Sequence, residues 1–580
     1  STGLCVTSTP VSSPTGSASL QLTFGWTDYT LFTGLLGVSV LIGIYFGCFG
    51  KKQDNTTEYL LGGKTMSFFP VSMSLVASHI SAVSLLGIPA EVYQYGSQYA
   101  ACIFSSFISC GLISLIYMPV FYQLQLTSTF EYLEIRFARP VRILASFLYS
   151  LSLIIYIPLI IYVPALAFSQ ATAINLHLIT PIICIVCIFY TTIGGLKAVV
   201  WADTVQMIVT LGSLLAVLIL GTIAVGGVAE TWRIAQEGHR VVFWNMDPSI
   251  FARNSFWGMS VGMSLTWVCG LGISQVSVQR FLAVPNIKEW VSVFTGLTMF
   301  ARYHKCDPIS THVPRSDQLL PYYVLDVAEN VPGLPGLFLA GLVSAGLSTM
   351  SAGLNTVAGT IYEDFIDPWL PESSNKETRA ANIMKVTVVI LGLLCVSLVF
   401  VVDRLGDIFQ VSMTLTGITA GSMLGLFSLG MLIPWATAKG AIAGGTISLG
   451  LMVWIIVGAQ INMARGRLVY QTLPTSTDEC ANVESLFNRT VTSQSTFAPV
   501  NEEDKPFVLY TVSFMYYTAL GFAVVMVIGT IVSFAFVSLE NENTSICRFR
   551  FLPRKKYTEV SLSSMPATLV INPEKEKLTS

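Results

Sequence analysis

The sequence predicts an all-α integral membrane protein, and composition is the first evidence for it. The chain has 580 residues, of which 53% are hydrophobic and only 11% charged, whereas about a quarter of the residues in soluble domains are charged. Its mean hydropathy is +0.66. The formal net charge is -2, which gives no electrostatic basis for a nucleic-acid partner. The partner that this composition indicates is the lipid bilayer.

Long apolar stretches are the second observation. Each is close to the roughly 20 residues that cross a hydrocarbon core about 30 Å thick. We expect residues 1–25, which are rich in Ser, Thr, Gly and Pro and have no basic cluster, to be an extracellular polar tail rather than a signal peptide. Twelve apolar stretches follow, at residues 29–47, 68–90, 101–122, 143–168, 178–191, 205–228, 256–274, 337–361, 386–402, 408–433, 441–457 and 512–537.

The positions of Lys and Arg predict the orientation. Basic residues follow the first, third, fifth and seventh stretches, whereas the connections around Tyr95 and Ala171 carry none. Cytoplasmic loops are enriched in Lys and Arg, so we expect an extracellular amino terminus. The basic tail, 538–580, indicates a cytoplasmic carboxyl terminus. The extracellular loop 461–506 contains a glycosylation sequon at Asn488.

These assignments require about thirteen crossings, because an even number would return the chain to its starting side. The missing helix falls in 276–304, between Arg280 and the loop 305–332, which we expect to be extracellular. Only 291–301 is apolar there, roughly half the length that a crossing needs. The sequence therefore predicts a shortened eighth helix, and we expect the chain as written to be retained in the cell or inactive.

Two stretches carry Gly and Pro inside the apolar run, at 78–89 and 258–272. An interrupted helix is tolerated in lipid only where it lines a cavity. Two interrupted helices, each beginning a block of five, are typical of inverted-repeat transporters. The alternative is that these glycines only allow close helix packing. On the first interpretation, 66–275 holds the first repeat and the start of the second, and 333–460 holds the rest of the second. The helices 26–50 and 507–537 flank them.

Several motifs occur in a fixed order along the chain. They lie at 130–137 (FEYLEIRF), 194–203 (GGLKAVVWAD), 279–280 (QR), 306–308 (CDP), 316–321 (SDQLLP), 332–338 (PGLPGLF) and 425–440. Over about 26–537 the chain resembles the sodium/solute symporter family, in the branch of the sodium-dependent multivitamin, monocarboxylate and iodide transporters. The resemblance implies a LeuT-type inverted five-helix repeat with extra flanking helices.

The same resemblance implies a sodium site between the second and ninth helices. Backbone carbonyls would come from Ala77, Ile80 and Ala345, and hydroxyls from Ser348 and Thr349. Neutral oxygens suit a hard cation such as sodium. The alternative is that Ser348 and Thr349 only bond the carbonyls of their own helix.

The resemblance also implies a substrate pocket, lined by His79, Ser84, Ser106, Tyr156 and Trp267. His79 either donates to an anion or only bonds a freed carbonyl, and both interpretations stay open. Ser84 stands where the iodide carrier has a glutamine, which weakens an iodide assignment. No Lys or Arg lies within the pocket-lining helices, so sodium, helix dipoles and hydroxyls would hold an anion.

Other features have plainer interpretations. Lys197 and Asp203 either pair as an inner gate or only flank the membrane. The eleven cysteines show no disulfide-scaffold spacing, and Cys184 and Cys187 are expected to be packing residues. There is no metal cluster, nucleotide loop or nucleophile motif, so we expect neither an enzyme nor a cofactor, with sodium as the coupling ion.

The function that these observations predict is sodium-coupled import of a small organic anion across the plasma membrane. A monocarboxylate or a carboxylate vitamin such as biotin or pantothenate is the expected substrate. The alternative is a non-transporting member that acts as a ligand sensor, or an inactive isoform.

Overall fold

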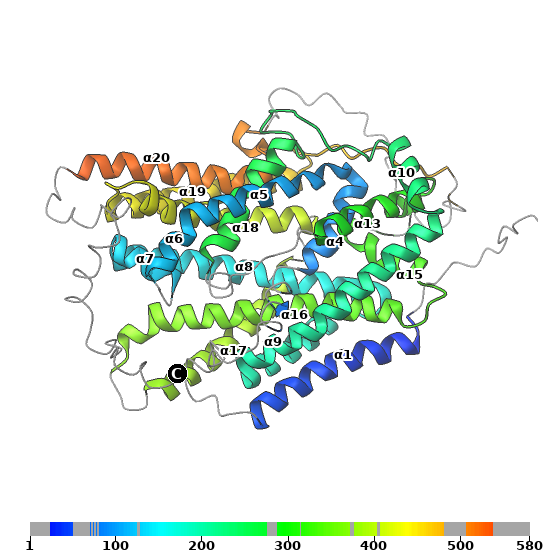
Figure 1. Ribbon diagram of the computed structural model, residues 1–580, viewed down its shortest axis with the longest axis horizontal. Coiled ribbons are helices and arrows are strands. Elements are labelled where there is room, and N and C mark those ends of the chain that lie inside the picture. The colour runs from blue at the N-terminus through cyan, green and yellow to red at the C-terminus, as the bar shows by residue number, and fades with distance from the viewer. Residues whose placement is uncertain are drawn as a thin grey trace, which may run out of the picture.

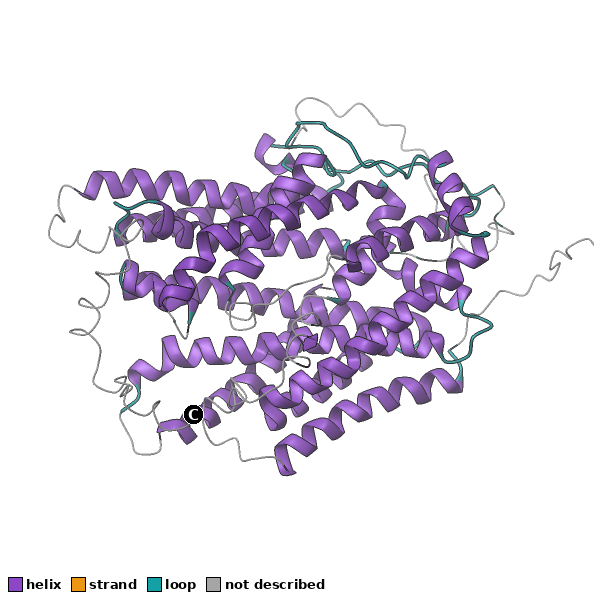
Figure 2. Ribbon diagram, in the orientation of Figure 1, coloured by secondary structure: helices purple, strands orange, loops and turns teal. Residues whose placement is uncertain are grey.

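The computed structural model confirms the all-α class. It describes residues 24–49, 70, 73–74, 77, 81–124, 128–274, 287–311, 313, 315–371, 376–402, 407–478, 480 and 506–537. Throughout these ranges the regular structure is helical (Figure 2). Nine described helices are long and apolar enough to cross a membrane.

The first half of the chain forms these helices: α1 (Trp26–Ile44), α4 (Ala82–Tyr95), α5 (Cys102–Leu112), α6 (Met118–Leu124), α7 (Thr129–Arg136), α8 (Arg139–Thr172), α9 (Leu176–Val225), α10 (Val228–Glu237) and α11 (Met263–Trp267). The second half forms α13 (Ile287–Tyr303), α14 (Pro308–Thr311), α15 (Leu319–Val327), α16 (Leu334–Ile361), α17 (Lys376–Val402), α18 (Ile408–Leu432), α19 (Ala438–Ala464) and α20 (Tyr517–Val537).

The long helices run side by side along the molecule. In Figure 1, α20, α19 and α5 lie along one edge, α1 and α17 along the opposite edge, and α8 and α18 between them. α16 packs against α8 and α9, and its apolar window is almost entirely buried. A helix that is apolar on every side belongs in such a position, because no polar face has to reach water.

The two Gly- and Pro-containing stretches behave differently from regular spans. α4 begins at Ala82, in the middle of the apolar stretch, where the Ser81 side chain accepts a hydrogen bond from the Val83 N–H at 3.2 Å. The second stretch contains two π-helical segments, η5 (Gly258–Gly262) and η6 (Val268–Ile273), on either side of α11. π turns widen the helix and are frequent at functional sites.

α9 holds both predicted helices, 178–191 and 205–228, in one element, Leu176–Val225. It contains two apolar segments, Leu176–Phe189 and Ala198–Val225. The two segments fold back beside each other, because Cys187 contacts the Leu347 carbonyl at 3.6 Å and the Thr210 hydroxyl donates to the Gly341 carbonyl at 3.0 Å, and both carbonyls belong to the same part of α16. α9 therefore holds the two spans that the sequence predicts, with the Gly-Gly pair of the 194–203 motif between them.

One end of the bundle is joined by covalent and polar contacts. A disulfide links Cys306 to Cys480, a pairing that the cysteine spacing did not predict, because the two residues are 174 positions apart. The buried Arg240 donates to the Pro474 carbonyl at 2.7 Å, and the Leu473 N–H donates to the Gln94 carbonyl at 2.9 Å. The carboxyl ends of α4, α10, α13 and α19 therefore meet at this end, which we call the disulfide end.

The opposite end is held by arginines. Arg142, near the start of α8, pairs with Asp364 after α16 at 2.7 Å. Arg136, at the end of α7, donates to the Gly430 and Ile433 carbonyls at the end of α18, each at 3.0 Å. We call this the arginine end.

α13 lies where the sequence predicts a shortened crossing, and it is not among the described helices that are long and apolar enough to cross a membrane. Its 17 residues extend six beyond the 11-residue apolar stretch 291–301, and most of its described side chains are buried. Gly296 allows close contact with α4, because a Cβ there would lie 2.8 Å from the Pro89 carbonyl oxygen. α13 ends three residues before Cys306, so its last turn lies at the disulfide end.

Candidate functional site

A cavity of about 300 Å³ lies where α4, α8, α11, η6, α16 and α18 meet. Its described lining is apolar with many hydroxyl groups, and no described lining residue is charged. The hydroxyl-bearing residues are Ser81, Ser84, Tyr99, Tyr149, Ser152, Tyr156, Thr266, Ser274, Thr349, Ser412, Thr416 and Thr419. The volume is at the low end for ligand pockets, which suits a small ligand.

The amino-terminal end of α4 faces this cavity. Ser81, Val83 and Ser84 are all lining residues, and the Ser84 hydroxyl donates to the Ser81 carbonyl at 2.8 Å. The first backbone N–H groups of a helix have no partner within it and carry a partial positive charge. An anion in the cavity is therefore favoured without a cationic side chain.

Two further predicted residues reach the same cavity from other helices. Tyr156 comes from the middle of α8, where its hydroxyl pairs with the side chains of Ser81 and Ser412. Trp267 is the last residue of α11, immediately before η6. The cavity thus joins Ser84, Tyr156 and Trp267, as the sequence analysis expected of a pocket.

The contribution of α18 to the cavity was not predicted. Ser412, Thr416 and Thr419 line the cavity, and they follow one another at spacings of four and three along a mostly apolar helix. This spacing places the hydroxyls on one helical face, and that pattern was the signal that could have found them.

Three of the predicted sodium ligands, Ala345, Ser348 and Thr349, lie on α16. Thr349 lines the cavity and donates to the Ala345 carbonyl at 3.0 Å, the local bond of the alternative interpretation. Ser348 is different, because its buried hydroxyl has no partner among the described residues. Ala77 is also buried. Ile80 and His79 lie outside the described residues.

Two other predicted residues, Ser106 and Asp203, are not part of the described cavity lining. Ser106 is absent from the described lining residues, and its hydroxyl donates to the Cys102 carbonyl at 3.4 Å. Asp203 is fully buried and accepts a hydrogen bond from Ser74 at 2.6 Å. The Lys197 side chain and Asn488 lie outside the described part of the chain.

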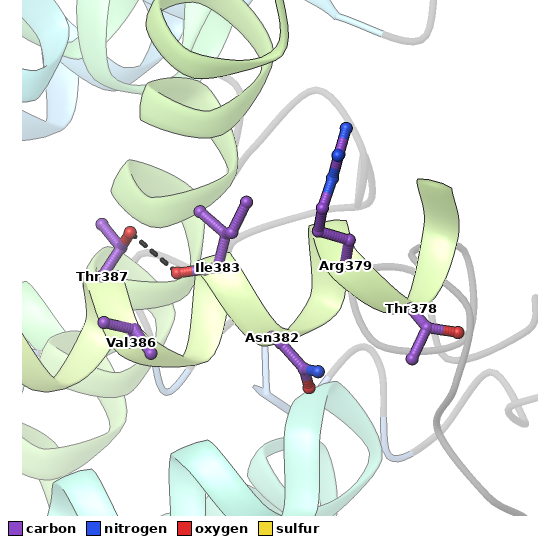
Figure 3. A pocket seen from close by; sticks show the side chains of 6 residues that line it. All are labelled: Thr378, Arg379, Asn382, Ile383, Val386 and Thr387. Atoms are coloured by element: carbon purple, nitrogen blue, oxygen red, sulfur yellow. Dashed lines mark hydrogen bonds between the residues drawn. The ribbon is translucent and has the colours of Figure 1, made fainter. Parts of the chain in front are cut away.

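A larger hollow of about 600 Å³ lies at the beginning of α17 (Figure 3). Its described lining side chains all belong to that one helix: Thr378, Arg379, Asn382, Ile383, Val386 and Thr387. The central cavity, in contrast, combines residues from several helices with the start of α4. We therefore take the central cavity as the candidate substrate site.

A helical bundle with an interrupted helix on either side of a mid-depth cavity defines a secondary transporter. The Sodium:solute symporter family model matches residues 59–448, and the chain belongs to this family. It is 35% identical over 537 residues to sodium-coupled monocarboxylate transporter 1 of Homo sapiens, an alignment that covers 88% of this chain and 87% of that protein. Identity is also 35%, over 549 residues, to the sodium-dependent multivitamin transporter of Oryctolagus cuniculus, with 91% and 85% covered.

A solved structure confirms the fold. A substrate-bound, outward-open Na⁺-coupled sialic acid symporter matches with a TM-score of 0.68 and 22% identity, covering 88% of this chain and 98% of that one. The chain is thus a multi-pass membrane protein of LeuT-type fold, as the sequence predicted.

Proposed function

We propose that this protein imports a small organic anion into the cell, coupled to sodium, with a monocarboxylate or a carboxylate vitamin as substrate. The observation that carries the proposal is the central cavity, where the start of α4 meets hydroxyl groups from α8, α11, α16 and α18. Its size suits a small acid, and its polarity suits an anion held without a cationic side chain. The names of the relatives, which are monocarboxylate and multivitamin transporters, support the substrate class.

Sodium would bind beside the substrate. The Ala77 and Ala345 carbonyls and the Ser348 and Thr349 hydroxyls offer the neutral oxygens that a hard cation needs. Each charge that moves through about 100 mV supplies about 2.3 kcal/mol, enough for more than tenfold accumulation of substrate. Sodium is a transported ion in this proposal, and no other cofactor or catalytic activity belongs to it.

The protein would lie in the plasma membrane with the disulfide end outside, because disulfides persist in oxidising compartments. The arginine end would be cytoplasmic, as the basic loops indicate. The tail 1–25 and the loop 461–506 with glycosylated Asn488 would then be extracellular, and the tail 538–580 cytoplasmic. Asp203, held by Ser74, would belong to an inner gate with Lys197.

The test is uptake by cells that express the chain. Radiolabelled lactate, biotin and pantothenate would each be offered in sodium medium and in choline medium of equal ionic strength. We expect uptake of at least one of them to require external sodium. Equal uptake in the two media would contradict coupling, and binding without any uptake would favour the ligand sensor.

A further inference from the structure

A buried ion pair lies between the central cavity and the disulfide end. Arg253, in the segment before η5, is 6% exposed, and Glu91, near the end of α4, is 3% exposed. The guanidinium donates from Nε to Glu91 Oε1 at 3.0 Å and from a terminal nitrogen to Oε2 at 2.9 Å. This bidentate geometry is the strong form of a carboxylate–arginine contact.

The same guanidinium contacts other parts of the chain. Its remaining terminal nitrogen donates to the Gln410 side-chain oxygen, on α18, at 2.6 Å. The rings of Tyr95, Tyr470 and Phe514 surround it, with centroids at 4.1, 4.8 and 5.0 Å. We call Arg253, Glu91 and Gln410 the clamp, since together they hold α4, α18 and the entry to η5.

The clamp adjoins the cavity directly. Gln410 follows Phe409, and Glu91 lies about one helical turn after Ile88, and both Phe409 and Ile88 line the cavity. The Phe409 ring packs against Tyr99 at 5.6 Å and against Phe514 at 6.4 Å. The three elements that the clamp joins are thus walls of the cavity at its side toward the disulfide end.

We propose that the clamp is the extracellular gate of the cavity, and that Arg253 receives the carboxylate of the entering substrate when the gate opens. This proposal rests on the proposed function, which supplies the direction of transport and the negative charge of the substrate. A solute from the disulfide end reaches the cavity by separating α4 from α18, which breaks the contacts of Arg253 with Glu91 and Gln410. The guanidinium then presents the planar fork that Glu91 occupied, and this fork fits a carboxylate.

Energetics favours such an exchange over simple opening. Removing one partner from a buried ion pair leaves an uncompensated charge, which is strongly unfavourable. A substrate carboxylate that replaces Glu91 keeps the guanidinium paired, whereas a neutral solute does not. Because no described lining residue of the cavity is charged, the clamp offers an entering anion a cationic side chain that the described lining lacks.

The first experiment measures access to the cavity from outside. Ser84→Cys places a thiol on the lining, and a membrane-impermeant methanethiosulfonate reagent reports how fast it is modified in intact cells, with the unsubstituted chain as background. Glu91→Gln removes the ion pair, and we expect modification to become about tenfold faster. The matched control is Arg233→Gln, because Arg233 forms an exposed pair with Glu230 and Glu237 on α10. If the thiol of Ser84→Cys were modified at the same rate with and without Glu91→Gln, the proposed gate would be overturned.

The second experiment tests the carboxylate. Lactate should slow modification of Ser84→Cys, and the neutral lactamide should not. Arg253→Lys keeps the charge and loses the fork, so we expect about tenfold more lactate to be needed for half-protection. The double variant Glu91→Gln with Arg253→Gln leaves no unpaired charge at this position. In this variant, lactate should no longer protect Ser84→Cys better than lactamide does. An unchanged preference would overturn the role of Arg253, and because protection needs no uptake, this result is separate from failure of the proposed function.

Discussion

At the scale of single residues, the hydroxyls beside the cavity are compatible with both interpretations of the Ser348 and Thr349 pair. Thr349 bonds its own helix through the Ala345 carbonyl, but a hydroxyl has one donor hydrogen and two acceptor lone pairs. Its oxygen can therefore still accept a cation. The buried Ser348 hydroxyl, which has no partner among the described residues, would add a second oxygen one residue away.

The corresponding prediction concerns sodium activation of uptake. Thr349→Ala removes one oxygen, and we expect the sodium concentration for half-maximal uptake to rise about tenfold or uptake to be lost, at unchanged surface expression. Thr349→Ser keeps the hydroxyl and should behave almost as the parent. Normal sodium activation in Thr349→Ala would remove Thr349 from the site.

Asp317 predicts a pH dependence of stability. This buried carboxylate accepts the Ile408 N–H at the start of α18, and burial, followed by repulsion from Asp407, raises its pKa to about 7. An unfolded Asp has a pKa of about 3.9, so the folded protein binds this proton more tightly. Its contribution therefore stabilises the fold increasingly as pH falls from about 7 toward about 4.

Thermal unfolding of the purified protein at pH 5.5 and pH 8 would measure this contribution. Asp317→Asn keeps an acceptor for Ile408 but cannot titrate. We expect the difference in Tm between the two pH values to shift by roughly a few degrees in the variant. An identical pH profile for parent and variant would contradict the assignment to Asp317.

At the scale of elements, Arg136 holds the end of α18. The last carbonyls of a helix lack partners within it, and Arg136 donates to those of Gly430, Ile433 and Pro434, each at 3.0 Å. One side chain thus connects two of the motifs that the sequence analysis singled out, at 130–137 and 425–440. α18 also carries three cavity hydroxyls and Gln410, so its anchoring positions both the site and the clamp.

We expect Arg136→Gln to reduce surface abundance and Tm, because it leaves carbonyls unsatisfied at a cost of about 1–3 kcal/mol each. Arg136→Lys should be intermediate, since one ammonium cannot replace the planar fork. Surface biotinylation would measure the effect. The matched control is Arg139→Gln, because Arg139 is an exposed arginine in the adjacent turn, and its surface abundance should equal that of the parent. If Arg136→Gln also reached the surface as abundantly as the parent, the contacts of Arg136 with the end of α18 would be dispensable.

At the scale of the whole molecule, α13 decides the orientation of every later helix. Its 17 residues extend about 25 Å, somewhat less than a hydrocarbon core of about 30 Å. Mismatch costs fractions of a kcal/mol per Å, so we expect the crossing to persist while delivery to the surface suffers. This refines the expectation of retention or inactivity that the apolar pattern alone supported.

The prediction is that Asn488 is glycosylated and the carboxyl tail is reached by antibody only after permeabilisation. Inserting about 17 to 20 apolar residues after Trp290 should raise sodium-dependent uptake per cell. A glycosidase shift, tail staining and uptake would be measured on both chains. An unglycosylated Asn488 with an extracellular tail would show that α13 fails to cross, and equal uptake by both chains would show that its length does not matter.

The sequence by itself determined the membrane class, most of the spans, the interrupted helices and the family. It could do so because the bilayer imposes length and polarity locally, on each segment separately, and because the motifs are contiguous. It also placed Ser84, Tyr156 and Trp267 in one pocket, and the structure shows that all three line one cavity.

Only the tertiary structure decided the rest. The Cys306–Cys480 disulfide, the α18 wall of the cavity and the pairing of Arg253 with Glu91 depend on which faces of distant segments meet. Composition and spacing carry no information about that meeting, because an isolated Glu at the end of a span and an Arg in a loop each read as ordinary surface charges. Packing buries both, and burial makes them a pair.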